Sequence, residues 1–92
     1  MSVISIQRTH QFSLEELREK IDKIINEISK KLELFSEWES DKILLFRRKG
    51  VNGCIEIDNN NFELTLRLGM MYRMLKGSIE NEVTEVVNGY IK

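Results

Sequence analysis

Three runs of alternating apolar and polar residues, between positions 43 and 68, constrain the fold of this chain more than any other feature. The last run, "NFELTLRLG", is the clearest, because a phenylalanine and three leucines fall at every second position. Side chains of a strand point alternately to its two faces, so this spacing predicts half-buried β-strands. The runs predict strands over residues 43–48, 53–57 and 62–68.

The turns between these strands set registers that agree with each other. A two-residue turn at positions 49–50, where a glycine supplies positive φ, pairs Phe46 with Gly53. A four-residue loop at 58–61 pairs Gly53 with Leu66. Both pairings put apolar residues on one face, and the missing side chain of Gly53 leaves room for the Phe46 ring. The residues expected to face the helices are Leu44, Phe46, Ile55, Ile57, Leu64 and Leu66.

A long amphipathic helix is predicted over residues 13–33. Ser13 and Glu16 have the spacing of a capping box, in which each side chain bonds the other residue's backbone N–H. Phe12 and Leu17 have the spacing of a hydrophobic staple. Apolar residues recur every three to four positions along one face, at Leu14, Leu17, Ile21, Ile24, Ile25, Ile28 and Leu32.

The tail returns to the helical period after a methionine-rich segment. A second helix is predicted to begin between residues 70 and 78, with its apolar face formed by Leu75, Ile79, Val83, Val86, Val87 and Tyr90. Met70, Met71 and Met74 lie at its start. Methionines can form an adaptable binding surface, but they more often fill gaps in a core, which is the interpretation we favour.

Two further strands complete the predicted fold. A β-branched run at 3–8 predicts a first strand, and "LFSEWES" at 34–40 predicts a weak one. We therefore expect a single α+β domain over residues 1–92 with the order β-α-β-β-β-β-α, an antiparallel sheet with two helices packed on one face. A spatial strand order of 2-3-4-5-1 makes every neighbouring pair antiparallel.

Composition narrows the classes of function. The chain of 92 residues is 41% hydrophobic and 32% charged, as globular domains are, and its net charge of −1 provides no field that would attract nucleic acid. The single cysteine, Cys54, allows neither an internal disulfide nor a CxxC metal site, so we expect no metal and no cofactor. No apolar run approaches the ~20 residues of a transmembrane segment, and we expect a soluble cytoplasmic protein.

Two positions are candidates for a functional site. Arg8-Thr9-His10 falls where the first strand ends, and strand ends often carry functional side chains. Since no cysteine lies near His10 in sequence, a Cys/His dyad is unsupported, and a polar bridge that closes the strand-to-helix corner is the simpler interpretation. Arg48 occupies a core-facing slot at a strand end, where an arginine must extend to solvent or meet an anion.

The segments "IQRTH", "ILLFRRKGVNGCIEI", "LTLRLG" and "KGSIENEV", in this order, resemble the small polyhydroxyalkanoic acid system proteins of bacteria. The resemblance covers nearly the whole chain and implies a link to bacterial polyester storage, through gene context or association with the granule, with no established reaction. The family often has proline at the place of Met74, so this chain's second helix can start earlier. The matching positions are Arg8, Thr9, His10, Trp38, Asp41, Phe46, Arg48, Gly50, Val51, Gly53, Leu68, Gly69, Lys76, Gly77, Ile79 and Glu80.

Two classes of function follow from the sequence. We favour a non-enzymatic accessory protein linked to polyhydroxyalkanoate storage, which binds the granule or its proteins, because no nucleophile–base pair is visible. The alternative is a small-ligand-binding protein or enzyme that uses His10, Arg48 and Lys76 on a carboxylate or acyl group. The residues expected to line such a site are Arg8, His10, Trp38, Arg48 and Lys76.

The sheet face turned away from the helices is a candidate interface. The predicted register places Leu45 opposite Cys54 and Cys54 opposite Thr65, with Ile43 alongside. Charged residues surround this patch, as they surround the apolar centre of many protein interfaces. A homodimer would most simply join two such faces, because a two-fold interface is self-complementary. The same patch could instead bind an apolar partner such as the granule surface, and a monomer with a few exposed aliphatic residues is the simpler alternative.

Overall fold

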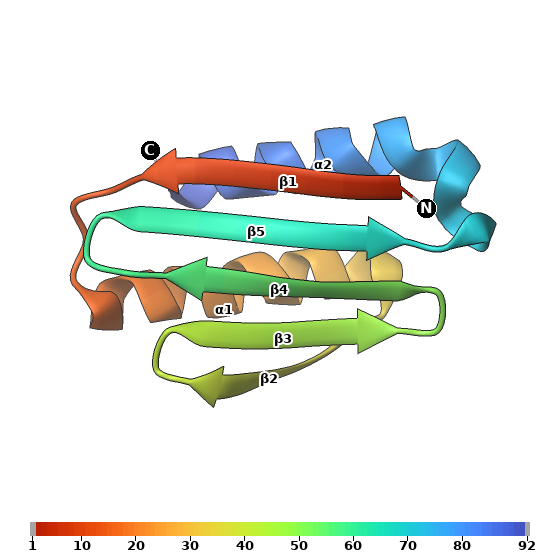
Figure 1. The fold of residues 1–92 in the computed structure, drawn as a ribbon. Coiled ribbons are helices and arrows are strands. Elements are labelled where there is room, and N and C mark those ends of the chain that lie inside the picture. Colours follow the sequence, from red (N-terminus) through yellow and green to blue (C-terminus); the bar gives the residue numbers. More distant parts are fainter. Residues whose placement is uncertain (1, 92) are drawn as a thin grey trace.

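The computed structural model describes residues 2–91, which form a five-stranded antiparallel sheet backed by two helices (Figure 1). The order of the strands in the sheet is β1-β5-β4-β3-β2, which confirms the predicted α+β fold and strand order. Both helices lie on one side of the sheet, with α2 behind β1 in the view of Figure 1. The elements are β1 (Ser2–Thr9), α1 (Leu14–Leu32), β2 (Phe35–Ser40), β3 (Ile43–Arg48), β4 (Val51–Ile57), β5 (Asn61–Leu68), the 3₁₀ segment η1 (Met70–Leu75) and α2 (Lys76–Tyr90).

The predicted registers of the central strands are confirmed. Phe46 pairs with Gly53, and Gly53 pairs with Leu66. Strand β4 begins two residues earlier than predicted, at Val51, because the tight turn lets pairing continue up to Arg48. The turn residue Gly50 has φ of +85°, a conformation that glycine adopts without strain. All six residues expected to face the helices are buried, namely Leu44, Phe46, Ile55, Ile57, Leu64 and Leu66.

Gly53 makes room for the aromatic ring on the neighbouring strand. A Cβ atom at this position would overlap the Phe46 ring and would lie 2.6 Å from the Thr65 carbonyl oxygen. The ring could move, but the carbonyl belongs to a paired strand and is fixed. The close approach of Phe46 to bare backbone therefore depends on glycine.

Helix α1 has nearly the bounds predicted for it. The Ser13 hydroxyl accepts from the Glu16 N–H at 3.2 Å, as in a capping box, but the Glu16 carboxylate meets the Ser13 hydroxyl rather than its backbone N–H. The helix ends at Glu33, which adopts a left-handed conformation with φ of 51° and donates its N–H to Ser29 O at 2.7 Å. This αL cap turns the chain back toward β2.

The second helix begins at Lys76, within the predicted interval, after one 3₁₀ segment. Ile79, Val83 and Val87 bury its apolar face against the sheet. Leu75 was expected to join this face but is 51% exposed, because it still belongs to the 3₁₀ segment, which turns at a different period. The methionines of this segment were expected to fill core gaps, and that expectation is wrong: Met70, Met71 and Met74 are exposed.

Replacing Gly53 with valine should destabilise the protein by about 1–3 kcal/mol, because the added atoms collide with Phe46 and with a fixed carbonyl group. Urea unfolding of the two proteins measures this difference. Gly77→Ala is the matched control, since a Cβ at Gly77 would meet nothing within 4 Å. Equal losses of stability in the two variants would contradict the role given to Gly53.

Candidate functional site

The structure does not bring the predicted ligand-binding residues together. Arg8 pairs with Phe62 at the start of β5, and His10 follows directly at the same end. Arg48 pairs with Val51, which pairs with Leu68 at the end of β5. Strand β5 has eight residues, which span about 23 Å at roughly 3.3 Å per step. His10 and Arg48 therefore lie at opposite ends of the sheet.

His10 closes the corner between β1 and α1. Its side chain is 6% exposed, and the ring stacks on Phe12 with centroids 5.9 Å apart. Nδ1 accepts the Phe12 N–H at 3.1 Å, so Nε2 carries the proton and donates to Asp58 O at 2.9 Å. Both ring nitrogens are therefore occupied by backbone groups, which supports the polar-bridge interpretation over a reactive one.

Arg8 connects the same end of the sheet to the last turns of α2. Its Nε and Nη2 atoms donate to Asn88 Oδ1 at 3.2 and 3.0 Å, and Nη1 donates to Gln7 O at 2.7 Å. Each of the three guanidinium nitrogens thus donates a hydrogen bond within the protein.

Arg48 connects the end of β3 to the C-terminal end of α1. Its Nη1 donates to Leu32 O at 2.8 Å, the last residue of the helix, and lies 3.9 Å from Glu33 Oε2. A helix C-terminus leaves carbonyl groups unpaired, and a cation there satisfies one of them. Arg48 was expected either to extend to solvent or to meet an anion, and in the structure it lies beside the carboxylate of Glu33.

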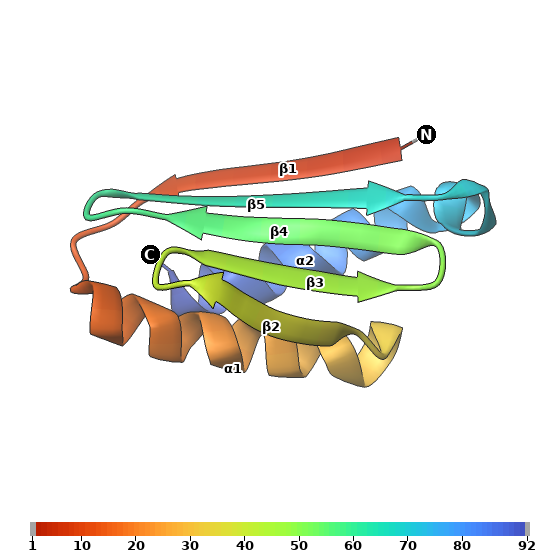
Figure 2. The same cartoon turned by 60° about the horizontal axis from the view of Figure 1, so that its bottom comes forward.

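Trp38 and Lys76, the other two predicted residues, lie in two further places. Trp38 Nε1 donates to Asp22 Oδ1 at 2.9 Å, and the Arg18 guanidinium lies 4.7 Å from the indole ring, so this residue ties β2 to α1 (Figure 2). Lys76 is the first residue of α2 and is half-buried. Five residues expected to share a site therefore occupy several separate positions.

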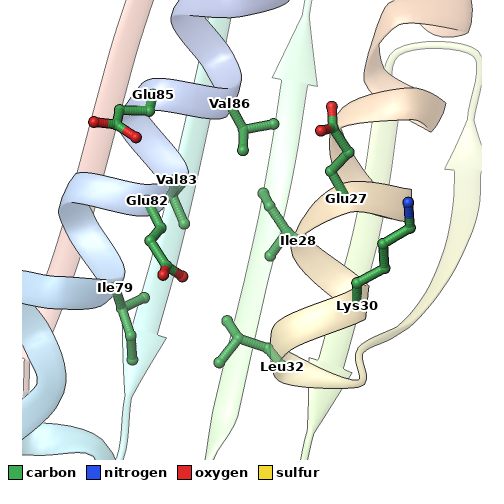
Figure 3. Close-up of a pocket in the computed structure, with 9 residues that line it drawn as sticks. All are labelled: Glu27, Ile28, Lys30, Leu32, Ile79, Glu82, Val83, Glu85 and Val86. Carbon is green, nitrogen blue, oxygen red and sulfur yellow. The ribbon is translucent and has the colours of Figure 1, made fainter.

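A groove runs between the two helices, and none of the five predicted residues lines it (Figure 3). It has a volume of about 240 Å³, with apolar walls from both helices. Three glutamates and one lysine line it, and this excess of negative charge disfavours a carboxylate ligand. The lining residues are Glu27, Ile28, Lys30, Leu32, Ile79, Glu82, Val83, Glu85 and Val86.

The most exposed apolar surface is at the end of the molecule formed by η1. We call it the methionine tip, which comprises Met70, Met71, Met74 and Leu75, with 86%, 74%, 97% and 51% of their surfaces exposed. Figure 1 shows this segment as a projection beyond the right-hand ends of the strands. Four of the six residues of this short segment are apolar and exposed, and clusters of exposed apolar residues often mark binding sites.

The methionine tip is attached firmly to the sheet. The half-buried ring of Tyr72 lies over Gly50, where a Cβ would come within 3.2 Å of Cε2. Gly69 N–H donates to Gly50 O at 2.7 Å, and Tyr72 N–H donates to Gly69 O at 3.0 Å. Tyr72 supplies the contact with the sheet, and Met70, Met71 and Met74 remain exposed to solvent.

The predicted interface residues lie on the open face of the sheet, by which we mean the face turned away from the helices. Leu45 pairs with Cys54, and Cys54 pairs with Thr65, as predicted. Burial raises the pKa of the Cys54 thiol above its ordinary value, with the nearby Glu56 and Glu63 carboxylates adding to the effect and Arg67 opposing it. The thiol is therefore neutral near pH 7 and a poor nucleophile.

Among residues 2–91, no group of three or more His, Cys, Asp and Glu side chains is placed to hold a metal ion. No helix in this part of the chain is long and apolar enough to cross a membrane.

The fold and its surfaces define a small α+β protein in which polar side chains tie the helices to the sheet and apolar side chains are exposed at one end. The chain belongs to the family described as "Putative polyhydroxyalkanoic acid system protein", whose model matches residues 4–91. The resemblance found in the sequence is thereby confirmed. No curated protein matches the chain.

Sequence reasoning missed two features of the surface. Phe35 is 78% exposed at the start of β2, beside Arg47 on the open face. The methionine tip was noticed in the sequence but assigned to the core. The absence of a capping residue before Lys76 was the available signal, because it indicates that the preceding segment is not an ordinary helical turn.

Replacing His10 with alanine should destabilise the protein by about 2 kcal/mol, because it leaves the Phe12 N–H and the Asp58 carbonyl unpaired. Thermal unfolding beside Gln11→Ala, an exposed neighbour, measures this loss. Long-range nitrogen–proton NMR should also show the proton on Nε2 of the wild-type imidazole. A proton on Nδ1 would contradict the corner geometry.

Proposed function

We propose that this protein is a non-enzymatic accessory protein of bacterial polyhydroxyalkanoate storage, which attaches to the polyester granule through its methionine tip. The observation that carries the proposal is the exposure of four neighbouring apolar side chains on one short, anchored segment. Family membership supplies the link to polyester storage.

The chemistry of the methionine tip suits an irregular apolar surface. Methionine side chains are unbranched and polarisable, so they adapt to a partner without a fixed shape. Arg73 lies on the same segment, with Lys49 at the adjoining turn and Lys76 directly after it. Their charged ends can stay in water while the methionines enter the polyester.

The proposal has three further parts. The protein acts in the cytoplasm, where bacteria store the polyester, and binds either the granule surface or the proteins that coat it. It also forms a homodimer through the open face, with Ile43, Leu45, Cys54 and Thr65 near the centre. The methionine tip and the open face are separate surfaces, so granule attachment and self-association can occur together.

The alternative, a ligand-binding protein or enzyme that uses His10, Arg48 and Lys76, has less support. A binding site needs convergent groups in a concave pocket. His10 and Arg48 lie at opposite ends of the sheet and bond backbone carbonyls there. Substituting them should therefore change stability rather than any affinity for an acyl compound.

Replacing Met70, Met71 and Met74 together with serine should weaken binding to amorphous poly(3-hydroxybutyrate) particles at least about tenfold, since each buried methionine contributes roughly 1 kcal/mol or more. Co-sedimentation with washed particles measures the bound fraction. Phe35→Ser, which removes an exposed apolar side chain from the open face, is the control and should bind as the wild type does. Equal binding by the triple variant would refute attachment through the methionine tip.

A further inference from the structure

The charges on the open face are ordered in rows that run across the strands. Residues paired between neighbouring strands form each row, and successive rows lie two residues, or about 6.6 Å, apart. The cationic row is Val3, Arg67, Asn52, Arg47 and Phe35. The central row is Ser5, Thr65, Cys54, Leu45 and Glu37. The anionic row is Gln7, Glu63, Glu56 and Ile43.

The anionic row contains a contact that costs stability in a single chain. Glu56 and Glu63 are directly paired across β4 and β5, and like charges at such positions repel each other. Gln7 Nε2 donates to Glu63 Oε2 at 2.6 Å, which supplies a hydrogen bond but no charge. Within residues 2–91, neither carboxylate forms an ion pair. A cation supplied from outside the chain would offset this repulsion.

A second copy of the chain can supply that cation. We infer that two copies pair through their open faces about a two-fold axis that lies between the sheets and runs across the strands. Such an axis reverses the strand direction, so the cationic row of one copy lies over the anionic row of the other. An axis parallel to the strands would instead place arginine over arginine and glutamate over glutamate. This inference rests on the self-association proposed above and specifies its geometry.

When two copies pair in this way, each row of one copy lies over a particular row of the other. Because the axis runs across the strands, each strand lies over the same strand of the second copy, about 10 Å away as in stacked sheets. Arg67 then faces the partner's Glu63, and Arg47 lies beside the partner's Glu56. Leu45, 37% exposed in one chain, meets its own counterpart in the central row, and so does Glu37 at the edge of the sheet, where solvent screens the repulsion.

The edges of the sheet are less suited to joining two copies. Helix α2 packs behind β1, where Arg8 bonds Asn88, so this edge carries a helix as well as a strand. On the other edge, β2 presents Glu37 and Glu39, and its pairing with β3 shifts between Trp38 and Ser40. Charges and irregular pairing discourage the addition of another strand. The open face is therefore the broad surface available to a second copy.

Charge reversal tests this arrangement. Arg67→Glu and Glu63→Arg should each weaken the dimer at least about tenfold, because each places like charges across the interface twice. The double variant exchanges the two charges and should recover most of the wild-type affinity. Sedimentation equilibrium in low salt measures the dissociation constants. Lys23→Glu, on the exposed side of α1, is the control for net charge and should leave the dimer unchanged.

The outcomes separate this inference from the proposed self-association. Rescue by the double variant supports the axis across the strands. A dimer that is lost in Leu45→Glu but has the wild-type dissociation constant in both charge-reversal variants uses the open face with another axis. A dimer that the double variant does not restore also uses another axis. Either result overturns this inference alone. A wild type that stays monomeric at every concentration overturns the inference and the self-association together.

Discussion

The contact between the Phe46 ring and the bare backbone of Gly53 is the constraint on which the rest of the structure depends. It is compatible with one register of β3 on β4, and that register places Leu44, Phe46 and Ile55 under the helices, while Ile43 and Leu45 lie on the open face. A slip of one residue would turn the core outward. The same register aligns the charged rows of the open face, so one glycine determines both the interior and the outer surface.

Two polar corners hold α1 against this sheet, and they explain why candidate site residues were found so far apart. His10 precedes the helix and bonds the loop between β4 and β5, whereas Arg48 bonds the carbonyl of the helix's last residue. Each corner uses a polar side chain to satisfy backbone groups that a short chain cannot bury otherwise. Arg8, His10 and Arg48, which match the family pattern, therefore have structural roles that are visible without any ligand.

The sheet and α1 could be predicted because their signals are local. A period of two, a glycine turn and a loop of fixed length determine the registers, and a serine cap begins the helix. The separation of His10 from Arg48 was implicit in the same registers. The end of β1 lies beside the start of β5, whereas the end of β3 pairs with the start of β4, which lies beside the end of β5. The exposure of the methionines was not implicit, because hydrophobicity predicts burial and cannot show that a 3₁₀ segment projects beyond the sheet.

The exposed thioethers also make one end of the molecule sensitive to oxidants. Hydrogen peroxide transfers an oxygen atom to methionine sulfur and leaves as water, which converts an apolar side chain into a polar sulfoxide that cellular reductases can restore. Met74, at 97% exposure, and Met70, at 86%, are open to this reaction, while none of the buried core residues within positions 2–91 is a methionine. Peroxide would therefore make the methionine tip polar without disturbing the buried side chains, and the proposed attachment to polyester would then depend on the redox state of the cell.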